Sequence, residues 1–145
     1  MDDYKYYYPI QIRYSDLDPQ WHVNNARYLT FLEQTRLQYL VDLGLFDGEH
    51  YFDLGWIVAD IHIAYLAPIR FAEEIRVGMR TTHLGNKSMK INYCIDNPAT
   101  GEMKARAEVV MVAYDYHESH SVVIPKLVRT KIAEFEGIQP GPDNH

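Results

Sequence analysis

The sequence has few of the features that mark secreted or membrane-spanning proteins. Cys94 is the only cysteine among 145 residues, so no disulfide can form within the chain and no cysteine-based zinc site exists. No apolar run approaches the roughly 18 residues that a membrane-spanning helix needs. The first ten residues, MDDYKYYYPI, lack the basic and apolar segments of a signal peptide. We therefore expect a protein of the reducing cytoplasm that has no membrane partner.

Positive charge is also scarce. The chain has 14 Lys and Arg against 20 Asp and Glu, a net charge of −6, and no run of Lys or Arg stands out. Because duplex binding depends on clustered cations, nucleic acid is not an expected partner. Most histidines show no spacing typical of metal ligands, so no metal is expected. These histidines are His50, His62, His83, His117 and His120.

The pattern that is present predicts one strand, one long helix and then several strands. Alternation predicts strands over 5–14, 55–69, 73–85, 87–96 and 102–116, with a short one near 121–124. The 3.6-residue period predicts a helix over 26–44, and a shorter helix follows Pro125. One helix cannot cover both faces of such a sheet. We therefore expect an α+β fold, with an antiparallel sheet wrapped around the long helix.

Residues 1–137 are expected to form a single domain, and residues 138–145, rich in Pro, Gly and Asp, a flexible tail. The exposed sheet edges and the outer sheet face favour a homodimer. Asn24 or Asn25 is the predicted cap of the long helix, and Gly44 its predicted end. The predicted inner stripe of that helix is aliphatic: Ala26, Leu29, Leu32, Leu37, Leu40 and Val41.

The segment DLDPQWHVNN, residues 16–25, is the richest in hydrogen-bonding side chains and directly precedes the long helix. Asp18 before Pro19 is typical of a turn, and an Asn at the helix start is typical of a cap. The same residues also suit chemistry, because a helix N-terminus offers unpaired N–H groups beside a carboxylate. The sequence alone supports both interpretations.

The longer stretch RYSDLDPQWHVNNARYLTFLEQTR, residues 13–36, resembles the 4-hydroxybenzoyl-CoA thioesterase-like family of hotdog-fold acyl thioesterases. Family members have an Asp-x-Asp, a short turn and an Asn-x-x-Tyr that leads into the central helix. DLDPQWHVNN is also similar to the active-site segment of plant acyl-acyl-carrier-protein thioesterases. YLAPIRFAEEIRV (65–77) and LGNKSMKINY (84–93) add weaker similarity, and the whole resemblance covers about residues 5–136.

The resemblance implies an enzyme that hydrolyses an acyl-CoA thioester to a free acid and CoA. It implies that Asp18 is the nucleophile or general base and that the backbone N–H of Asn25 polarises the thioester. It assigns Asp16 to ordering the loop. CoA is part of the substrate, so no separate cofactor is expected. The family's sites lie at subunit interfaces, which implies a homodimer or a dimer of dimers.

Other candidates have two readings each. His22 matches a catalytic His of the plant enzymes, yet a His bonded to the loop is the alternative. Tyr28 either packs in the first helical turn or contacts substrate. Glu33 is an alternative carboxylate, since some hotdog thioesterases place theirs on the helix; otherwise it pairs with Arg36.

Cations after the tight turn at Gly85 are the candidates for binding CoA phosphates. Lys87 and Ser88 match the family's Lys-Ser hairpin, although an ordinary solvated hairpin explains them equally well. Two other functions fit the same chain. One is a thioesterase that acts on acyl groups carried by acyl carrier protein, and the other is a non-catalytic hotdog module that binds an acyl ligand.

Overall fold

The computed structural model describes residues 4–49 and 54–142. In chain order the elements are β1 (Tyr6–Ile10), a short 3-10 helix (Tyr14–Asp16), α1 (Asn25–Asp42), β2 (Gly55–Tyr65), β3 (Ile75–Leu84), β4 (Ser88–Asp96), β5 (Met103–Asp115), β6 (His120–Ser121) and α2 (Lys126–Glu136).

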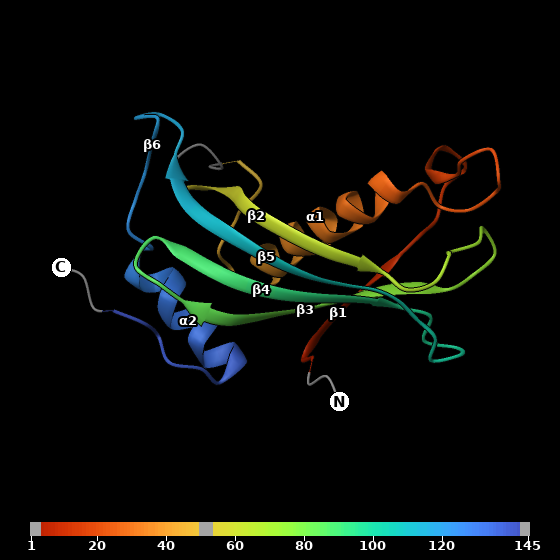
Figure 1. Ribbon diagram of the computed structural model, residues 1–145. Helices are drawn as coiled ribbons and strands as arrows, with labels where there is room; N and C mark the ends of the chain where they lie inside the picture. Colours follow the sequence, from red (N-terminus) through yellow and green to blue (C-terminus); the bar gives the residue numbers. More distant parts are fainter. Residues whose placement is uncertain (1–3, 50–53, 143–145) are drawn as a thin grey trace.

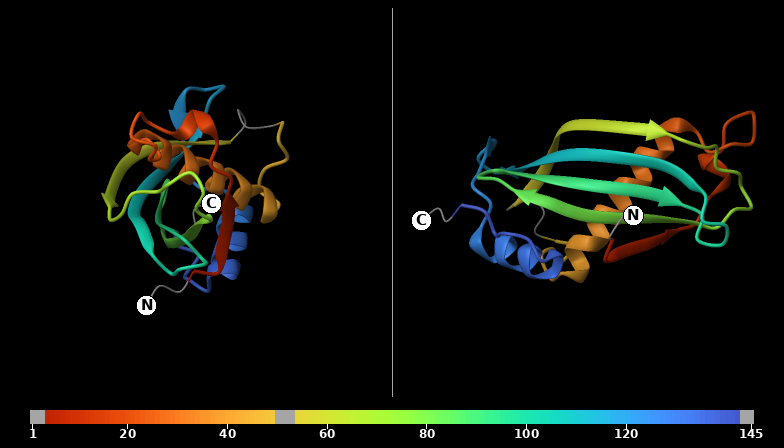
Figure 2. Two further views of the ribbon diagram at one scale, coloured as in Figure 1. Left: turned by 90° about the vertical axis from the view of Figure 1, so that its right-hand side faces the viewer. Right: turned by 60° about the horizontal axis from the view of Figure 1, so that its bottom comes forward.

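The strands form one antiparallel sheet in the order β1-β3-β4-β5-β2, with β6 added to β5. The sheet curves around α1, which runs along its concave face, and α2 lies at one end of the molecule (Figure 1, Figure 2). The predicted class is therefore confirmed: an antiparallel sheet around one long helix, with a short helix at the C-terminal end. The order leaves β1 and β2 at the two edges.

The core lies between α1 and the concave face of the sheet. Alternate residues of the central strands are buried there, which is the period-2 pattern of a sheet with one covered face. Examples are Met89, Ile91 and Tyr93 on β4, and Val109 and Met111 on β5.

The predicted inner stripe of α1 is wrong in part. The buried residues are Tyr28, Phe31, Leu32, Thr35, Tyr39 and Leu40. Leu37 and Val41 are exposed in the single chain. Aromatic rings and a threonine, whose hydroxyl donates to the carbonyl oxygen of Phe31, form most of the inner face. The prediction used aliphatic residues alone, and it therefore placed the buried face of α1 at the wrong rotation about the helix axis.

Element ends differ from the predictions in three main places. β2 stops at Tyr65, where its pairing with β5 ends, and not at residue 69. β1 stops at Ile10, where its pairing with β3 ends, and the chain then turns through the 3-10 helix instead of continuing to residue 14. The last strand pairs only at His120 and Ser121, earlier than predicted. The caps are as expected, because Asn24 caps α1 and Gly44, with a φ of 74°, follows its end.

Beyond α2 the structure describes the chain as far as residue 142, and Arg129 donates to the carbonyl oxygen of Pro140 at 2.9 Å. The flexibility of the tail stays a prediction. Residues 143–145 lie outside the described residues, as does His50 in the gap at residues 50–53.

A buried carboxylate ties α2 to the sheet. Glu136 accepts hydrogen bonds from the Tyr39 hydroxyl at 2.7 Å and from the backbone N–H of Thr81 at 2.9 Å, where the β3–β4 register shifts. We expect Tyr39→Phe to lower the free energy of unfolding by about 1–3 kcal/mol, because a buried carboxylate loses its donor. Urea denaturation at neutral pH measures this loss. Tyr6→Phe is the matched control, since its hydroxyl donates to the exposed Asp42. Equal losses in the two variants would contradict the assignment.

Candidate active site

The segment between the 3-10 helix and α1 folds back on itself as a narrow hairpin. The backbone N–H of Asn24 donates to the carbonyl oxygen of Asp16 at 2.8 Å, and Leu17 pairs with Val23 in an antiparallel bridge. The hairpin therefore brings its first carboxylate, Asp16, directly beside the cap of the helix. Backbone pairing, and not side-chain packing alone, fixes its shape.

Asp18 forms the turn of this hairpin with only one of its carboxylate oxygens. Oδ1 accepts from the backbone N–H of Gln20 at 2.9 Å and from that of His22 at 3.3 Å. The backbone N–H of Asp18 donates in turn to the carbonyl oxygen of His22 at 2.8 Å. Among the residues that the structure describes, none donates a hydrogen bond to Oδ2. Asp18 is thus a turn residue that keeps one carboxylate oxygen unoccupied.

The start of α1 offers an unpaired backbone donor. The side chain of Asn24 accepts from the N–H of Ala26 at 2.9 Å, and the carbonyl oxygen of Asn24 accepts from the N–H of Arg27 at 2.8 Å. The N–H of Asn25, in the first position of the helix, has no acceptor within residues 4–49 and 54–142. The hydroxyl of Tyr65 donates to the carbonyl oxygen of Asn25 at 3.1 Å. This bond holds the next peptide along the helix from the β2 side.

We expect Asn24→Ala to lower the free energy of unfolding by about 1 kcal/mol, the usual value for a lost helix cap. It should also slow turnover, because the Asn25 N–H is no longer held in one direction. Chemical denaturation and steady-state rates measure the two effects. Asn25→Ala is the matched control, because it changes the neighbouring side chain and keeps both the cap and the backbone donor. A slower Asn25→Ala with a normal Asn24→Ala would contradict this reading.

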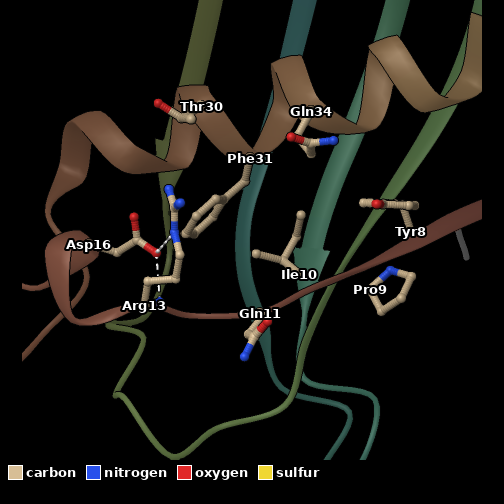
Figure 3. A pocket seen from close by; sticks show the side chains of 9 residues that line it. All are labelled: Tyr8, Pro9, Ile10, Gln11, Arg13, Asp16, Thr30, Phe31 and Gln34. Atoms are coloured by element: carbon tan, nitrogen blue, oxygen red, sulfur yellow. Dashed lines mark hydrogen bonds and ion pairs between the residues drawn. The ribbon is translucent and has the colours of Figure 1, made fainter.

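Asp16 orders the loop, as the resemblance implied. It is 1% exposed, its Oδ2 accepts from the backbone N–H of Arg13 at 2.8 Å, and its Oδ1 lies 3.8 Å from Nε of Arg27. A cavity of about 420 Å³ lies behind it, between β1 and α1, with the Arg13 side chain between Asp16 and Phe31 (Figure 3). This cavity lies on the β1 side of the helix.

His22 and Tyr28 differ in whether their side chains contact the rest of the chain. The His22 backbone forms the hairpin and also a bridge to Arg70, while its ring makes no hydrogen bond within the described chain. Tyr28 is buried, packs its ring against Tyr65 at 4.9 Å and donates its hydroxyl to the carbonyl oxygen of Ala67 at 3.3 Å. Burial raises the pKa of Tyr28 above its usual value. The packing role is therefore visible, and direct roles for either residue in the reaction stay predictions.

The ion pair expected between Glu33 and Arg36 is not formed in the part of the chain that the structure describes. Arg36 instead lies near Tyr93. Burial raises the pKa of Tyr93 to about 12, and the positive charge of Arg36 opposes that rise. Glu33 is exposed on α1 and remains the alternative carboxylate.

Lys87 and Ser88 lie at the opposite end of the sheet from Asp18 in the same chain. Ser88 pairs with Val112 of β5. The end of β5 nearest the Asp18 hairpin is at Lys104, which donates to the carbonyl oxygen of Pro68. Those two β5 residues are about eight positions, or roughly 26 Å, apart. Figure 1 shows the β3–β4 turn at one end of the molecule and the loop before α1 at the other. One chain alone therefore does not bring the two predicted parts of the site together.

Several residues at the hairpin end were not predicted from the sequence. The aromatic side chains of Tyr14 and Trp21 are both exposed, 6.3 Å apart, and help to line a pocket of about 340 Å³ that includes Asp18. Trp21 has a φ of 64°, which is uncommon for a bulky residue. The buried Lys104 and its partner Glu73 also lie at this end. The sequence carried no clear signal for them, because β5 contains other charged residues such as Arg106 and Glu108.

Among residues 4–49 and 54–142, no group of His, Cys, Asp or Glu is placed so that it could hold a metal ion. The expectation that the site needs no metal stays a prediction. None of the helices that the structure describes has both the length and the apolar character needed to cross a membrane.

Comparison with known proteins shows which family has this sequence and fold. A model of the thioesterase-like superfamily matches residues 12–132. The long-chain acyl-CoA thioesterase FadM of Escherichia coli (strain K12) is 27% identical over 126 residues, covering 87% of this chain and 96% of FadM.

Solved structures agree with the family match. A thioesterase from Thermus thermophilus, complexed with coenzyme A and Zn, has a TM-score of 0.81 and 29% identity, and the alignment covers 96% of this chain and all of that one (100%). The PA5185 protein from Pseudomonas aeruginosa strain PAO1 has a TM-score of 0.84 and 28% identity, over 94% of this chain and 95% of that chain. The predicted hotdog fold is confirmed.

Proposed function

The chain belongs to the thioesterase-like superfamily and is a thioester hydrolase, and we propose that it cleaves acyl-CoA with Asp18 as the reacting carboxylate and the Asn25 N–H as the oxyanion donor. One observation carries the proposal. Oδ1 of Asp18 is held by two backbone N–H groups while Oδ2 has no partner in the described chain, so the carboxylate is both fixed and available. The name of the relative FadM, a long-chain acyl-CoA thioesterase, supports CoA as the carrier.

The reaction needs little beyond these groups. As a general base, Asp18 removes a proton from water while the water oxygen attacks the thioester carbon, and the carbonyl oxygen becomes an oxyanion that the Asn25 N–H stabilises. The C–S bond then breaks. As a nucleophile, Asp18 attacks the same carbon and forms an anhydride that water later hydrolyses. Because thiols ionise near pH 8.5, the CoA thiolate leaves without an obligatory general acid.

The proposed acyl-CoA site needs a second subunit to bring Lys87 and Ser88 to the end of the sheet where Asp18 lies. β2 is an edge strand on which several large apolar side chains are exposed in the single chain, including Val58 at 42% and Ile61 at 39%. An exposed apolar edge of this kind favours strand pairing with a second copy. Antiparallel pairing of β2 with the partner's β2 about a two-fold axis reverses the strand direction. The partner's β3–β4 turn, with its Lys87 and Ser88, would then lie at the same end as Asp18.

A panel of substrates tests the function. Purified protein is given saturated acyl-CoAs of graded chain length and aromatic acyl-CoAs, and thiol release is followed. We expect turnover of at least one member, abolished in Asp18→Asn. Turnover only when the same acyl group is presented on acyl carrier protein would move the activity to that carrier. Binding of acyl-CoA without any turnover would instead support a non-catalytic acyl-binding module.

We expect Lys87→Ala to raise KM for acyl-CoA and leave kcat nearly unchanged, because a remote phosphate contact contributes equally to ground and transition states. Lys90→Ala is the matched control, since this neighbouring lysine is also exposed on the same hairpin. The KM effect should shrink for an acyl-pantetheine thioester, which lacks the nucleotide phosphates. Equal losses on both substrates would show that Lys87 acts on the fold or at the carbonyl.

A further inference from the structure

The chain between β2 and β3 turns a corner at residues 66–70. The buried Lys104 contacts this corner from β5. Lys104 of β5 is 2% exposed. Its ammonium group donates to the carbonyl oxygen of Pro68 at 3.0 Å, lies 2.7 Å from Oε1 of Glu73 and contacts the carboxylate of Glu102. An ammonium group has three donors, and here each has an acceptor.

Glu73 continues the support on the far side of the corner. Its Oε2 accepts from the backbone N–H of Arg70 at 2.8 Å, and its own backbone N–H donates to the carbonyl oxygen of Arg70 at 3.2 Å. Its Oε1 also accepts from Nδ2 of Asn97 at 3.1 Å. The backbone carbonyl of Lys104 accepts from the N–H groups of Leu66 and Ala67. The side chains of the ion pair therefore hold Pro68 and Arg70, while the backbone of Lys104 holds Leu66 and Ala67.

The opposite side of the same corner carries the Asp18 hairpin. The N–H of Val23 donates to the carbonyl oxygen of Ile69 at 2.8 Å, and His22 forms an antiparallel bridge with Arg70. The Tyr28 hydroxyl reaches the carbonyl oxygen of Ala67, so the first turn of α1 rests on the corner as well. The hairpin and the helix start thus share one support.

We propose that Lys104 and Glu73 are positioning residues of the active site: their ion pair holds the 66–70 corner in the place where the Asp18 hairpin and the start of α1 pair with it. The proposal rests on the proposed thioesterase function for its rate effects. Neither residue touches the reacting atoms. They act through backbone placement, and displacement of a reacting group by about 1 Å can cost about 10²-fold in rate.

The ionisation of the pair agrees with this role. Burial alone would raise the pKa of Glu73, but hydrogen bonds from Lys104, Arg70 and Asn97 hold it below its usual value. Burial would lower the pKa of Lys104, but Glu102 and Glu73 raise it. Glu73 therefore stabilises the folded corner above its unfolded pKa, and this contribution is lost as pH falls through the lower folded value. Lys104 contributes below its unfolded pKa and loses its contribution only in strong alkali.

The test uses the full-length protein and two readouts. Lys104→Met keeps the length of the side chain without the charge, and Glu73→Ala removes the acceptor for the Arg70 N–H. We expect kcat to fall about tenfold or more with KM within about twofold, the signature of lost transition-state placement. Hydrogen exchange should rise in residues 16–25 and remain unchanged in α2. The matched control is Glu102→Gln, which contacts the same ammonium but, among the described residues, no part of the corner. Both readouts should stay normal in this control.

Each outcome decides the proposal. Normal exchange and normal kcat in Lys104→Met and Glu73→Ala would overturn it, as would faster exchange throughout the chain with kcat preserved, which marks a merely stabilising pair. Where Lys104→Met does not fold, Glu73→Gln takes its place, because it keeps the size and an amide oxygen for Arg70. If wild-type protein hydrolyses no thioester, the proposed function fails, whereas the exchange measurement still tests the support of the hairpin.

Discussion

Asp18→Asn should lower kcat by about 10²-fold or more, the loss that follows removal of a general base or nucleophile. The substitution is unusually clean in this structure. Of the two carboxylate oxygens, Oδ1 holds the turn through the N–H groups of Gln20 and His22, and an asparagine oxygen can accept both bonds. The amide nitrogen then replaces the unpartnered Oδ2 and can neither accept a proton nor attack. Thiol-release kinetics and thermal melting, measured on the same preparation, separate chemistry from folding.

Asp16→Asn is the matched control for this prediction. It changes the other carboxylate of the same hairpin, which is buried and bonded to the Arg13 backbone and close to Arg27. Its main effect should be a lower melting temperature. A large melting loss in Asp18→Asn with kcat preserved would make Asp18 a turn residue only. Glu33→Gln would then decide whether the reacting carboxylate lies on α1 instead.

The local features of the site could be predicted because they depend on neighbours in sequence. A turn at Asp18-Pro19 and a cap at Asn24 both involve backbone groups within a few residues, and the structure has both. The fold class followed from the same kind of signal, namely alternation in the strands and a 3.6-residue period in one helix.

Features that depend on distant contacts could not be predicted. Which face of α1 is inside depends on how Tyr28 and Tyr39 pack against Tyr65 and the sheet, and aliphatic spacing alone gave a rotated face. The link between Lys104 and Glu73 joins β5 to the corner before β3, about thirty positions apart, and only the antiparallel register brings them together. Lys104 is one of several charged residues in β5, so the sequence indicated neither that it is buried nor which residue it pairs with.

A charge placed on the β2 edge should separate the subunits and remove most of the activity. Ile61→Asp puts a carboxylate in the middle of the exposed apolar edge, where two-fold pairing would bring two copies close together. We expect the variant to sediment as a monomer and to lose about 10²-fold or more in kcat/KM, since burying unpaired like charges is costly. Glu108→Gln is the matched control: its residue pairs with His62 beside this strand, yet it lies on β5 and not at the edge. It should remain dimeric and active.

Mixing two impaired subunits tests the composite site directly. Asp18→Asn removes the carboxylate of one chain, and Lys87→Ala removes the cation that antiparallel β2 pairing would deliver from the other. A heterodimer of the two variants has one site with both residues intact and one with neither. After subunit exchange at equal concentrations, half of the dimers are mixed, so about a quarter of all sites should behave as wild type at low acyl-CoA. If each site uses its Asp18 and Lys87 from one chain, mixing restores no site, and the rate stays at the average of the two parents. That result would exclude the shared site even if the protein is a dimer. A single subunit would then have to span the roughly 26 Å that separate the Asp18 end of its sheet from the Lys87 end.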